Sequence, residues 1–143
     1  MDETWINETD FRRCKWREYG DKNVVSIHSL APRITLIAAL DTMGSIYITL
    51  TQANSNNKTM EIYFYHLVGK LDKERPGWRD DTVLLLDGAS YHRSASTLNV
   101  LKFLRVPTLI FGPHSYDISP CELFFSFIKS SELNPAYLPT GKK

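Results

Sequence analysis

Residues 82–92 read TVLLLDGASYH, and this stretch decides the fold. Four apolar residues, Val83–Leu86, end in a carboxylate at Asp87, and small residues then lead to His92. A run this apolar is typical of a strand that is buried on both faces of a sheet. In open α/β sheets the functional crevice lies beyond the carboxyl ends of the strands, so we expect Asp87 to lie at that crevice.

The rest of the chain predicts strands and helices without internal repeats. Two segments rich in β-branched and aliphatic residues flank a turn at 41–44 and predict a hairpin. The expected strands are Arg33–Leu40, Ser45–Thr51, Thr82–Leu86 and Val106–Phe111, and the expected helices run from Thr59 to before Pro76, from Ser94 to Leu104 and from Glu122 to Lys129. Strands alternate with helices in the second half, which indicates parallel pairing there and a mixed α/β sheet flanked by helices.

Length and composition fit one globular domain of 143 residues, of which 43% are hydrophobic and 12% aromatic. The 17 Lys and Arg nearly balance the 16 Asp and Glu, so net charge gives no argument for a nucleic-acid partner, and a local patch would have to bind one. The apolar stretches are too short to span a membrane, and Cys14 and Cys121 form no metal-binding pair. We expect a soluble protein with free thiols and no membrane partner.

Three carboxylates each adjoin an apolar segment: Asp2, Asp87 and Glu122. If the fold brings them together, they repel one another and raise one another's pKa unless divalent cations neutralise them. Oxygen ligands without clustered Cys or His favour Mg²⁺ or Mn²⁺. Two such ions can activate a water or a 3′-hydroxyl and stabilise the leaving oxygen of a phosphodiester.

Three segments that contain these acids resemble, in the same order, the catalytic domain of the mariner-type superfamily of DDE transposases. They are Met1–Trp5 (MDETW), Leu84–His92 (LLLDGASYH) and Tyr116–Lys129 (YDISPCELFFSFIK). Thirty-four residues separate Asp87 from Glu122, the spacing of the Glu-bearing branch of that superfamily. The resemblance covers nearly the whole chain, from Asp2 to about Lys129.

The resemblance implies a ribonuclease-H-like fold and an enzyme that hydrolyses DNA at transposon ends and joins the freed 3′-hydroxyl to target DNA. Asp2, Asp87 and Glu122 would be its catalytic residues and the ligands of two Mg²⁺ ions, with Mn²⁺ as a substitute. His92 would orient Asp87 or contact DNA, and a structural role at a helix start is an equal alternative. Because the family carries a helix-turn-helix region upstream, residues 1–143 are expected to be a single catalytic domain without that region and without part of the first strand.

A cationic segment is the second candidate for DNA contact. It contains Arg12, Arg13, Lys15, Trp16 and Arg17. Binding that ignores base sequence needs such cations and can use an aromatic ring for stacking, although a solvated strand edge has the same composition. Lys129 is a weaker addition to this footprint. The expected partners are double-stranded DNA, both transposon ends and target, and a second copy of the full-length protein; the expected location is the nucleus of a eukaryotic host or the cytoplasm of a bacterium.

Two alternative functions stay open. A ribonuclease or junction nuclease with the same fold would use the same acids. A decayed or domesticated domain would keep the fold for binding without catalysis, and the expected lack of the upstream region favours that alternative. Gly88 and Leu123 stand where the resembled family usually has Asn, and neither departure removes an acid. Glu3 is expected to be solvated or to modulate the charge of the site, and the aromatic side chains of the last helix, including Phe127, are expected in the core.

Overall fold

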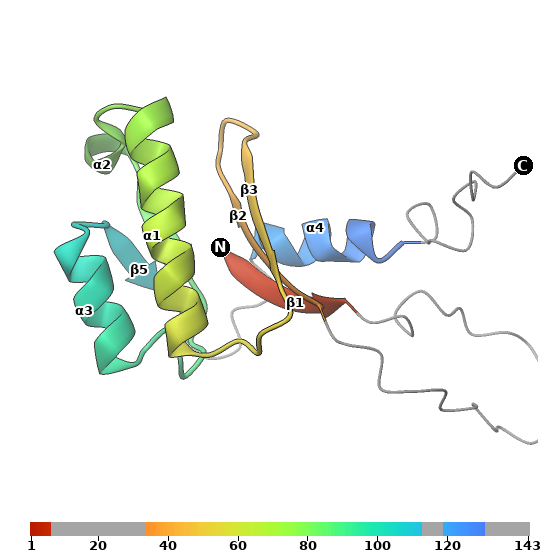
Figure 1. Cartoon of the computed structure of the whole chain (residues 1–143). Helices are drawn as coiled ribbons and strands as arrows, with labels where there is room; N and C mark the ends of the chain where they lie inside the picture. Colours follow the sequence, from red (N-terminus) through yellow and green to blue (C-terminus); the bar gives the residue numbers. More distant parts are fainter. Residues whose placement is uncertain (7–33, 113–118, 131–143) are drawn as a thin grey trace, which may run out of the picture.

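The computed structural model describes residues 1–6, 34–112 and 119–130. In chain order they form β1 (Asp2–Ile6), β2 (Ile34–Leu40), β3 (Ile46–Thr51), α1 (Asn57–Glu74), α2 (Trp78–Asp81), β4 (Leu84–Leu86), α3 (Ala95–Phe103), β5 (Thr108–Ile110) and α4 (Pro120–Ile128). Figure 1 shows α1 and α3 on one side of the strands and α4 on the other. Within the described ranges, no helix is both long and apolar enough to cross a membrane.

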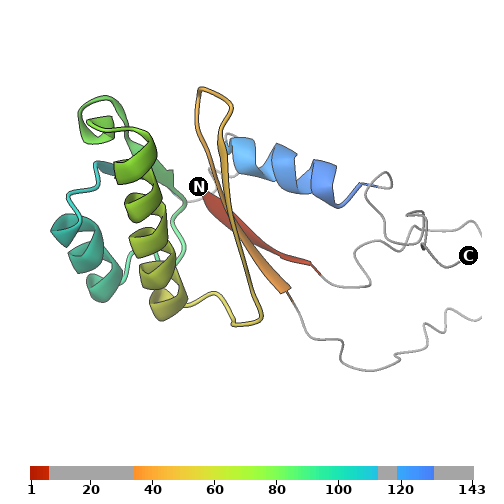
Figure 2. The ribbon, with the colours of Figure 1, turned by 45° about the horizontal axis from the view of Figure 1, so that its top comes forward.

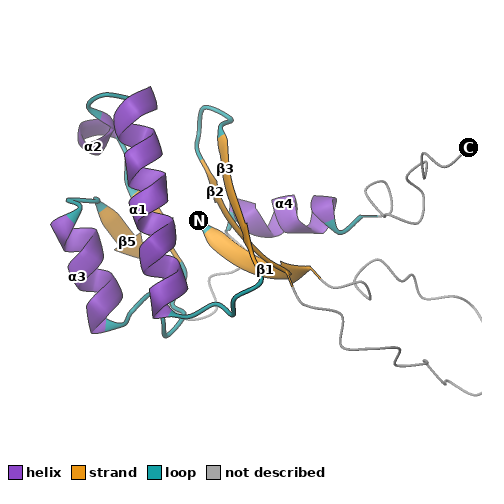
Figure 3. Ribbon diagram, viewed as in Figure 1, coloured by secondary structure: helices purple, strands orange, loops and turns teal. Residues whose placement is uncertain are grey.

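The strands combine antiparallel and parallel pairing, as the sequence predicts. β1, β2 and β3 are antiparallel neighbours in that order, and β4 pairs with β5 in parallel. The backbone nitrogen of Met1 donates a hydrogen bond to the Leu85 carbonyl at 2.9 Å, which places β1 beside β4 and links the two groups of strands. Figure 3 shows β1, β2 and β3 between α1 and α4, with β5 beside α1 and α3.

The hairpin turn between β2 and β3 is held by one side chain. The Asp41 carboxylate accepts hydrogen bonds from the backbone N–H groups of Met43 and Ser45, both at 2.8 Å. Gly44 has φ of +88°, a conformation that residues with a Cβ seldom adopt. Residues 41–44 therefore form the turn that the sequence predicts.

The main core lies between the sheet and α1. Asn56 caps this helix by accepting a hydrogen bond from the Thr59 N–H at 3.0 Å. One face of α1 is buried against β2 and β3; its buried residues are Met60, Tyr63, Phe64, Leu67, Val68 and Leu71, and the strands supply Ile37, Ala39 and Tyr47. The Tyr63 hydroxyl donates a hydrogen bond to the Tyr47 carbonyl at 3.3 Å, so this buried hydroxyl has a partner within the core.

A second, smaller core lies between the sheet and α4. Cys121 and Phe125 pack there against Leu36 and Ala38 of β2. The view in Figure 2 shows the resulting order of layers, with the strands between α1 and α4. Phe127 is 58% exposed, so its expected place in the core is wrong: it lies on the outer side of α4.

β4 is shorter and more exposed to solvent than the sequence predicts. β4 begins at Leu84 rather than Thr82, because residues 78–81 form α2 and Thr82 ends that helix. Leu86 is fully buried, but Leu85 is 38% and Val83 56% exposed, so burial on both faces is wrong for the described residues. The reason is that, among the described residues, the contacts of α4 are mainly with β1 and β2.

Candidate active site

Asp2 is the first residue of β1 and is buried on the α4 side of the sheet. It pairs with Ala38 of β2, whose side chain belongs to the α4 core. The pKa of Asp2 is raised to about 6, mainly by burial and then by the negative charges of Glu3, Asp87 and Glu122. The Glu3 N–H donates to Asp2 Oδ1 at 2.8 Å and partly opposes this shift. Asp2 is therefore a carboxylate that is costly to ionise at neutral pH.

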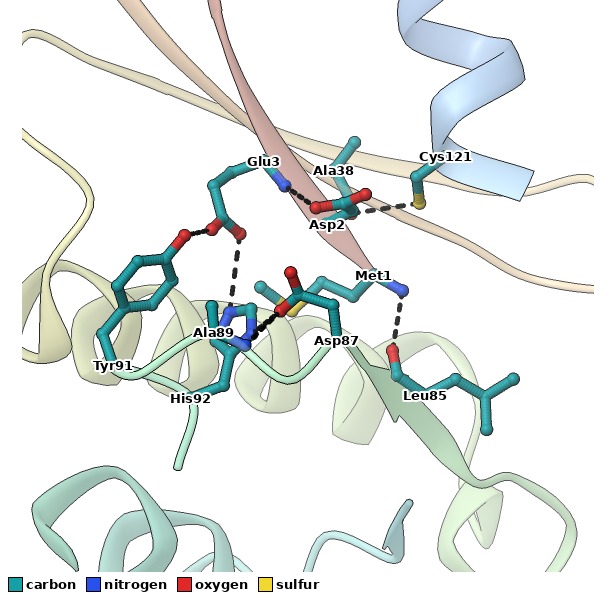
Figure 4. A network of polar contacts seen from close by, with 10 residues as sticks. All are labelled: Met1, Asp2, Glu3, Ala38, Leu85, Asp87, Ala89, Tyr91, His92 and Cys121. Carbon is teal, nitrogen blue, oxygen red and sulfur yellow. Dashed lines mark hydrogen bonds and ion pairs between the residues drawn. The ribbon is translucent and has the colours of Figure 1, made fainter. Parts of the chain in front are cut away.

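Asp87 follows β4 and lies at the carboxyl end of the strand, as predicted. Its Oδ1 accepts hydrogen bonds from His92 Nδ1 at 2.5 Å and from the Ala89 N–H at 3.1 Å (Figure 4). The bond from His92 is the main reason that the pKa of Asp87 lies below its usual value. Asp87 is thus an ionised acid held in place through one of its two oxygens.

His92 is completely buried and lies between two carboxylates. Its Nδ1 contacts Asp87, and its Nε2 lies 3.5 Å from Oε2 of Glu3. Burial lowers the pKa of His92, but the hydrogen bond with Asp87 and the negative charge of Glu3 outweigh it and raise the pKa to about 9. The ring is therefore a charged imidazolium at neutral pH, and its contact with Asp87 matches the orienting role expected from the sequence.

Glu3 belongs to this network, although the sequence interpretation placed it in solvent or in a modulating role. Its side chain is only 6% exposed, and its Oε1 accepts a hydrogen bond from the Tyr91 hydroxyl. The strand period of two explains the burial: Glu3 pairs with Ile37, which faces the α1 core, whereas Asp2 faces α4. Applying that alternation to β1 would have revealed Glu3 from the sequence.

Glu122 lies in the first turn of α4 and is exposed to solvent. The residue before it, Cys121, is buried, and its Sγ donates to the Ala38 carbonyl at 3.7 Å. Because consecutive helical residues point about 100° apart, the inward Cys121 sets the direction of Glu122. The negative charge of Glu122 still acts on the pKa of Asp2, which brings all three predicted acids into one electrostatic neighbourhood.

The DNA-contact residues predicted from the sequence fall in two places. Lys129 ends α4, and its Nζ donates to Thr4 Oγ1 at 2.8 Å, so it ties this helix to β1. The cationic segment lies outside the described residues; its members are Arg12, Arg13, Lys15, Trp16 and Arg17.

The family comparison covers the complete sequence. The profile of the family described as DDE superfamily endonuclease matches residues 1–143. The chain belongs to this superfamily. The family resemblance inferred from three short segments is thereby confirmed, and the DDE endonuclease domain accounts for the whole length of the sequence.

Solved structures with the same fold come from the Mos1 transposase. The Mos1 paired-end complex with left transposon end has a TM-score of 0.66 at 22% identity, over 90% of this chain and 39% of that one. The Mos1 mariner paired end complex with Mn gives 0.65 at 23%, over 88% and 39%. The catalytic domain of Mos1 mariner transposase gives 0.62 at 22%, over 88% and 55%. The ribonuclease-H-like α/β fold is confirmed.

The DDE endonuclease domain described here spans about two fifths of the length of the full Mos1 chains that it matches. No curated protein matches the sequence.

The acids of this DDE endonuclease fit a divalent cation in their chemistry. Asp2 and Asp87 each use Oδ1 for hydrogen bonds, and among the described residues no hydrogen bond reaches either Oδ2. Carboxylate oxygens are the ligands that Mg²⁺ and Mn²⁺ prefer. In the part of the chain that the structure describes, no three His, Cys, Asp or Glu side chains are already gathered as a metal site. The carboxylate oxygens are thus suitable ligands, and the acid side chains would come together when the cation binds.

Proposed function

We propose that this chain is the catalytic domain of a DNA transposase, which hydrolyses the phosphodiester bond at transposon ends and transfers the freed 3′-hydroxyl into target DNA. One observation carries the proposal: Asp2 is a carboxylate that is only 8% exposed, and its pKa is raised to about 6 by burial and by the negative charges of Glu3, Asp87 and Glu122. Acids that repel one another in this way are stabilised by a bound cation, which neutralises them.

Asp2, Asp87 and Glu122 would hold two Mg²⁺ ions, with Mn²⁺ as a substitute. Bound cations would activate the attacking oxygen and stabilise the leaving oxygen of the phosphodiester. The protein itself contributes position: Asp2 begins β1, Asp87 follows β4, and the first turn of α4 carries the glutamate. His92 holds Asp87 by one oxygen.

Double-stranded DNA is the proposed partner, both as transposon ends and as target. The cationic segment and Lys129 would contact its phosphates, and these residues are Arg12, Arg13, Lys15, Trp16, Arg17 and Lys129. The solved Mos1 complexes with a transposon end support this choice by analogy. We also propose that the full-length protein acts as a homodimer on paired ends, in the nucleus of a eukaryotic host.

Thermal unfolding with and without Mn²⁺ tests the metal site before any DNA is needed. At a concentration ten times the Kd, binding to the native state stabilises it by about 1.4 kcal/mol, which raises Tm by several degrees. We expect this shift in the wild-type chain and its loss in Asp87→Asn and Glu122→Gln. Asp80→Asn and Glu74→Gln remove exposed acids of α2 and α1 and should keep it.

Cleavage of a matched transposon-end substrate tests the reaction itself. Asp87→Ala and Glu122→Ala should each abolish cleavage, and activity retained in either variant would rule out the proposed roles. An RNA–DNA hybrid offered beside the DNA substrate separates a transposase from a ribonuclease with the same acids.

A binding domain without catalysis is the second candidate, and one observation favours it. The described residues contain no three metal-ligating side chains already gathered. This alternative predicts a cooperatively folded chain whose Tm does not respond to Mn²⁺.

A further inference from the structure

Glu3 is a buried acid that the proposed chemistry does not use. Its Oε1 accepts a hydrogen bond from Tyr91, and its Oε2 is buried, makes no hydrogen bond within the described residues and lies 3.5 Å from His92 Nε2. A carboxylate in such a place is costly unless a positive charge compensates it. The imidazolium of His92 supplies that charge.

His92 is fixed on three sides. Asp87 contacts one ring nitrogen, Glu3 faces the other, and the ring of Tyr91 stands edge-on at 4.8 Å between centroids and 81° between planes (Figure 4). The side chain of His92 has no exposed surface. The ring cannot turn without giving up both carboxylates.

The fixed ring determines how Asp87 is presented. Its Oδ1 is held by His92 and by the Ala89 N–H, and its other oxygen points toward β1 in Figure 4. We propose that Glu3 is a positioning residue that acts through His92: its carboxylate, held by the Tyr91 hydroxyl, faces Nε2 of the buried ring, and the ring so fixed holds Oδ1 of Asp87 and leaves the other oxygen of that acid available to a cation. This inference rests on the proposed function, and the residues that carry it are Glu3, Tyr91 and His92.

The consequence of removing the Glu3 carboxylate follows from the geometry. In Glu3→Gln, His92 Nε2 would face an amide in place of Oε2, and Asp87 and the edge of Tyr91 would hold the ring. A ring that can shift no longer fixes Oδ1 of Asp87, so the carboxylate would be less well oriented toward a cation. Groups that orient a metal ligand typically change metal affinity by about 10- to 100-fold when they are removed, so we expect the Mn²⁺ affinity to fall about tenfold.

A double-mutant cycle measured by Mn²⁺ titration calorimetry tests this inference. The four chains are wild type, Glu3→Gln, His92→Asn and the double variant. If Glu3 acts through His92, the double variant binds Mn²⁺ no more weakly than His92→Asn alone. Tyr91→Phe, which removes the hydroxyl that holds Glu3, should weaken binding in the same direction and by less.

Tyr63→Phe is the matched control. It also deletes a buried tyrosine hydroxyl, but one that bonds to the Tyr47 carbonyl in the α1 core. We expect Tyr63→Phe to lower stability and to leave Mn²⁺ affinity unchanged. The inference is overturned if Glu3→Gln folds with unchanged Mn²⁺ affinity, or if it weakens binding as much in His92→Asn as in wild type.

A second measurement does not depend on the metal. The Ala89 N–H bonds to the oxygen of Asp87 that His92 holds, so its NMR chemical shift reports how that carboxylate is oriented. Glu3→Gln should move this amide resonance, and Tyr63→Phe should not. If the wild-type chain binds no Mn²⁺, the proposed function fails, while a moved Ala89 resonance would still support positioning by Glu3 and an unmoved one would reject it.

Discussion

The two faces of the sheet are built for different purposes. The face toward α1 is covered by a helix of 18 residues and contains the larger apolar core. The face toward α4 is covered by a helix of nine residues, has a small core around Cys121 and Phe125, and contains the buried Asp2. The apolar core under α1 stabilises the fold, and this stability offsets the cost of the buried carboxylate of Asp2 on the α4 face.

The largest expected effect is a cavity in the α1 core. Phe64→Ala should lower the free energy of unfolding by about 3–5 kcal/mol, because Phe64 is fully buried and its neighbours cannot close the space. Phe125→Ala on the α4 face should cost less, at about 3 kcal/mol, the low end of the range for this change, because a short helix at a partly open face can relax more. Urea unfolding of both variants measures the difference, and equal losses would contradict the asymmetry of the two faces.

The second expected effect is a pH dependence of stability, which comes from the ion pair between His92 and Asp87. Because the folded pKa of His92 is raised to about 9 from 6.5, its contribution is fully present below pH 6.5 and is lost as the pH rises through 9. The contribution of Asp87, whose pKa is lowered, is lost only in acid, as the pH falls below its ordinary value of 3.8. We expect the metal-free chain to lose about 2 kcal/mol between pH 6.5 and 9.5.

His92→Asn is the reference for that pH measurement, because it removes the titrating ring. Unfolding of both chains is followed in urea with EDTA at each pH. The difference in unfolding free energy between wild type and His92→Asn should shrink toward high pH, and a constant difference would show that the ring is not charged in the folded chain.

Asp2→Asn should stabilise the metal-free chain. The pKa of Asp2 is raised to about 6 from 3.8, so its ionised form at pH 7.5 opposes folding, and its favourable contribution is lost as the pH rises through this range. Replacing it with a neutral side chain should raise the free energy of unfolding by about 1–2 kcal/mol. Calorimetric unfolding with EDTA measures the gain, Asp80→Asn is the neutral comparison, and a loss of stability would contradict the opposing charge.

The smallest expected effect belongs to the open part of the α4 face. Ile48 of β3 is 50% exposed there, so Ile48→Thr should change the free energy of unfolding by less than about 0.5 kcal/mol. The neighbouring residue Tyr47, whose side chain lies on the opposite face, is buried, and Tyr47→Thr should lower the free energy of unfolding far more. A large loss in Ile48→Thr, seen by urea unfolding, would remove the contrast between the faces.

The sequence alone predicted the hairpin, α1 and the place of Asp87, because these depend on local turn chemistry and on periodicity. It placed Glu3 in solvent or in a modulating role because only Asp2 belongs to the acid triad, although the alternation of the strand turns Glu3 toward the α1 core. It misjudged Val83 and Leu85 because an apolar run indicates a strand but does not reveal what covers it. That information belongs to the tertiary structure, in which the contacts of α4 among the described residues are mainly with β1 and β2.

β1 also has a consequence for the order in which the protein is made. Its contacts with β4 and with the end of α4 join positions 84 and 125 residues apart, the kind of long-range closure that slows folding. The hairpin and α1 can form from neighbouring residues while the chain is still being synthesised. Glu122 leaves the ribosome after Asp2 and Asp87, so a nascent protein holds its two aspartates for a time without the third acid, and a copy that stops before Glu122 cannot assemble the set.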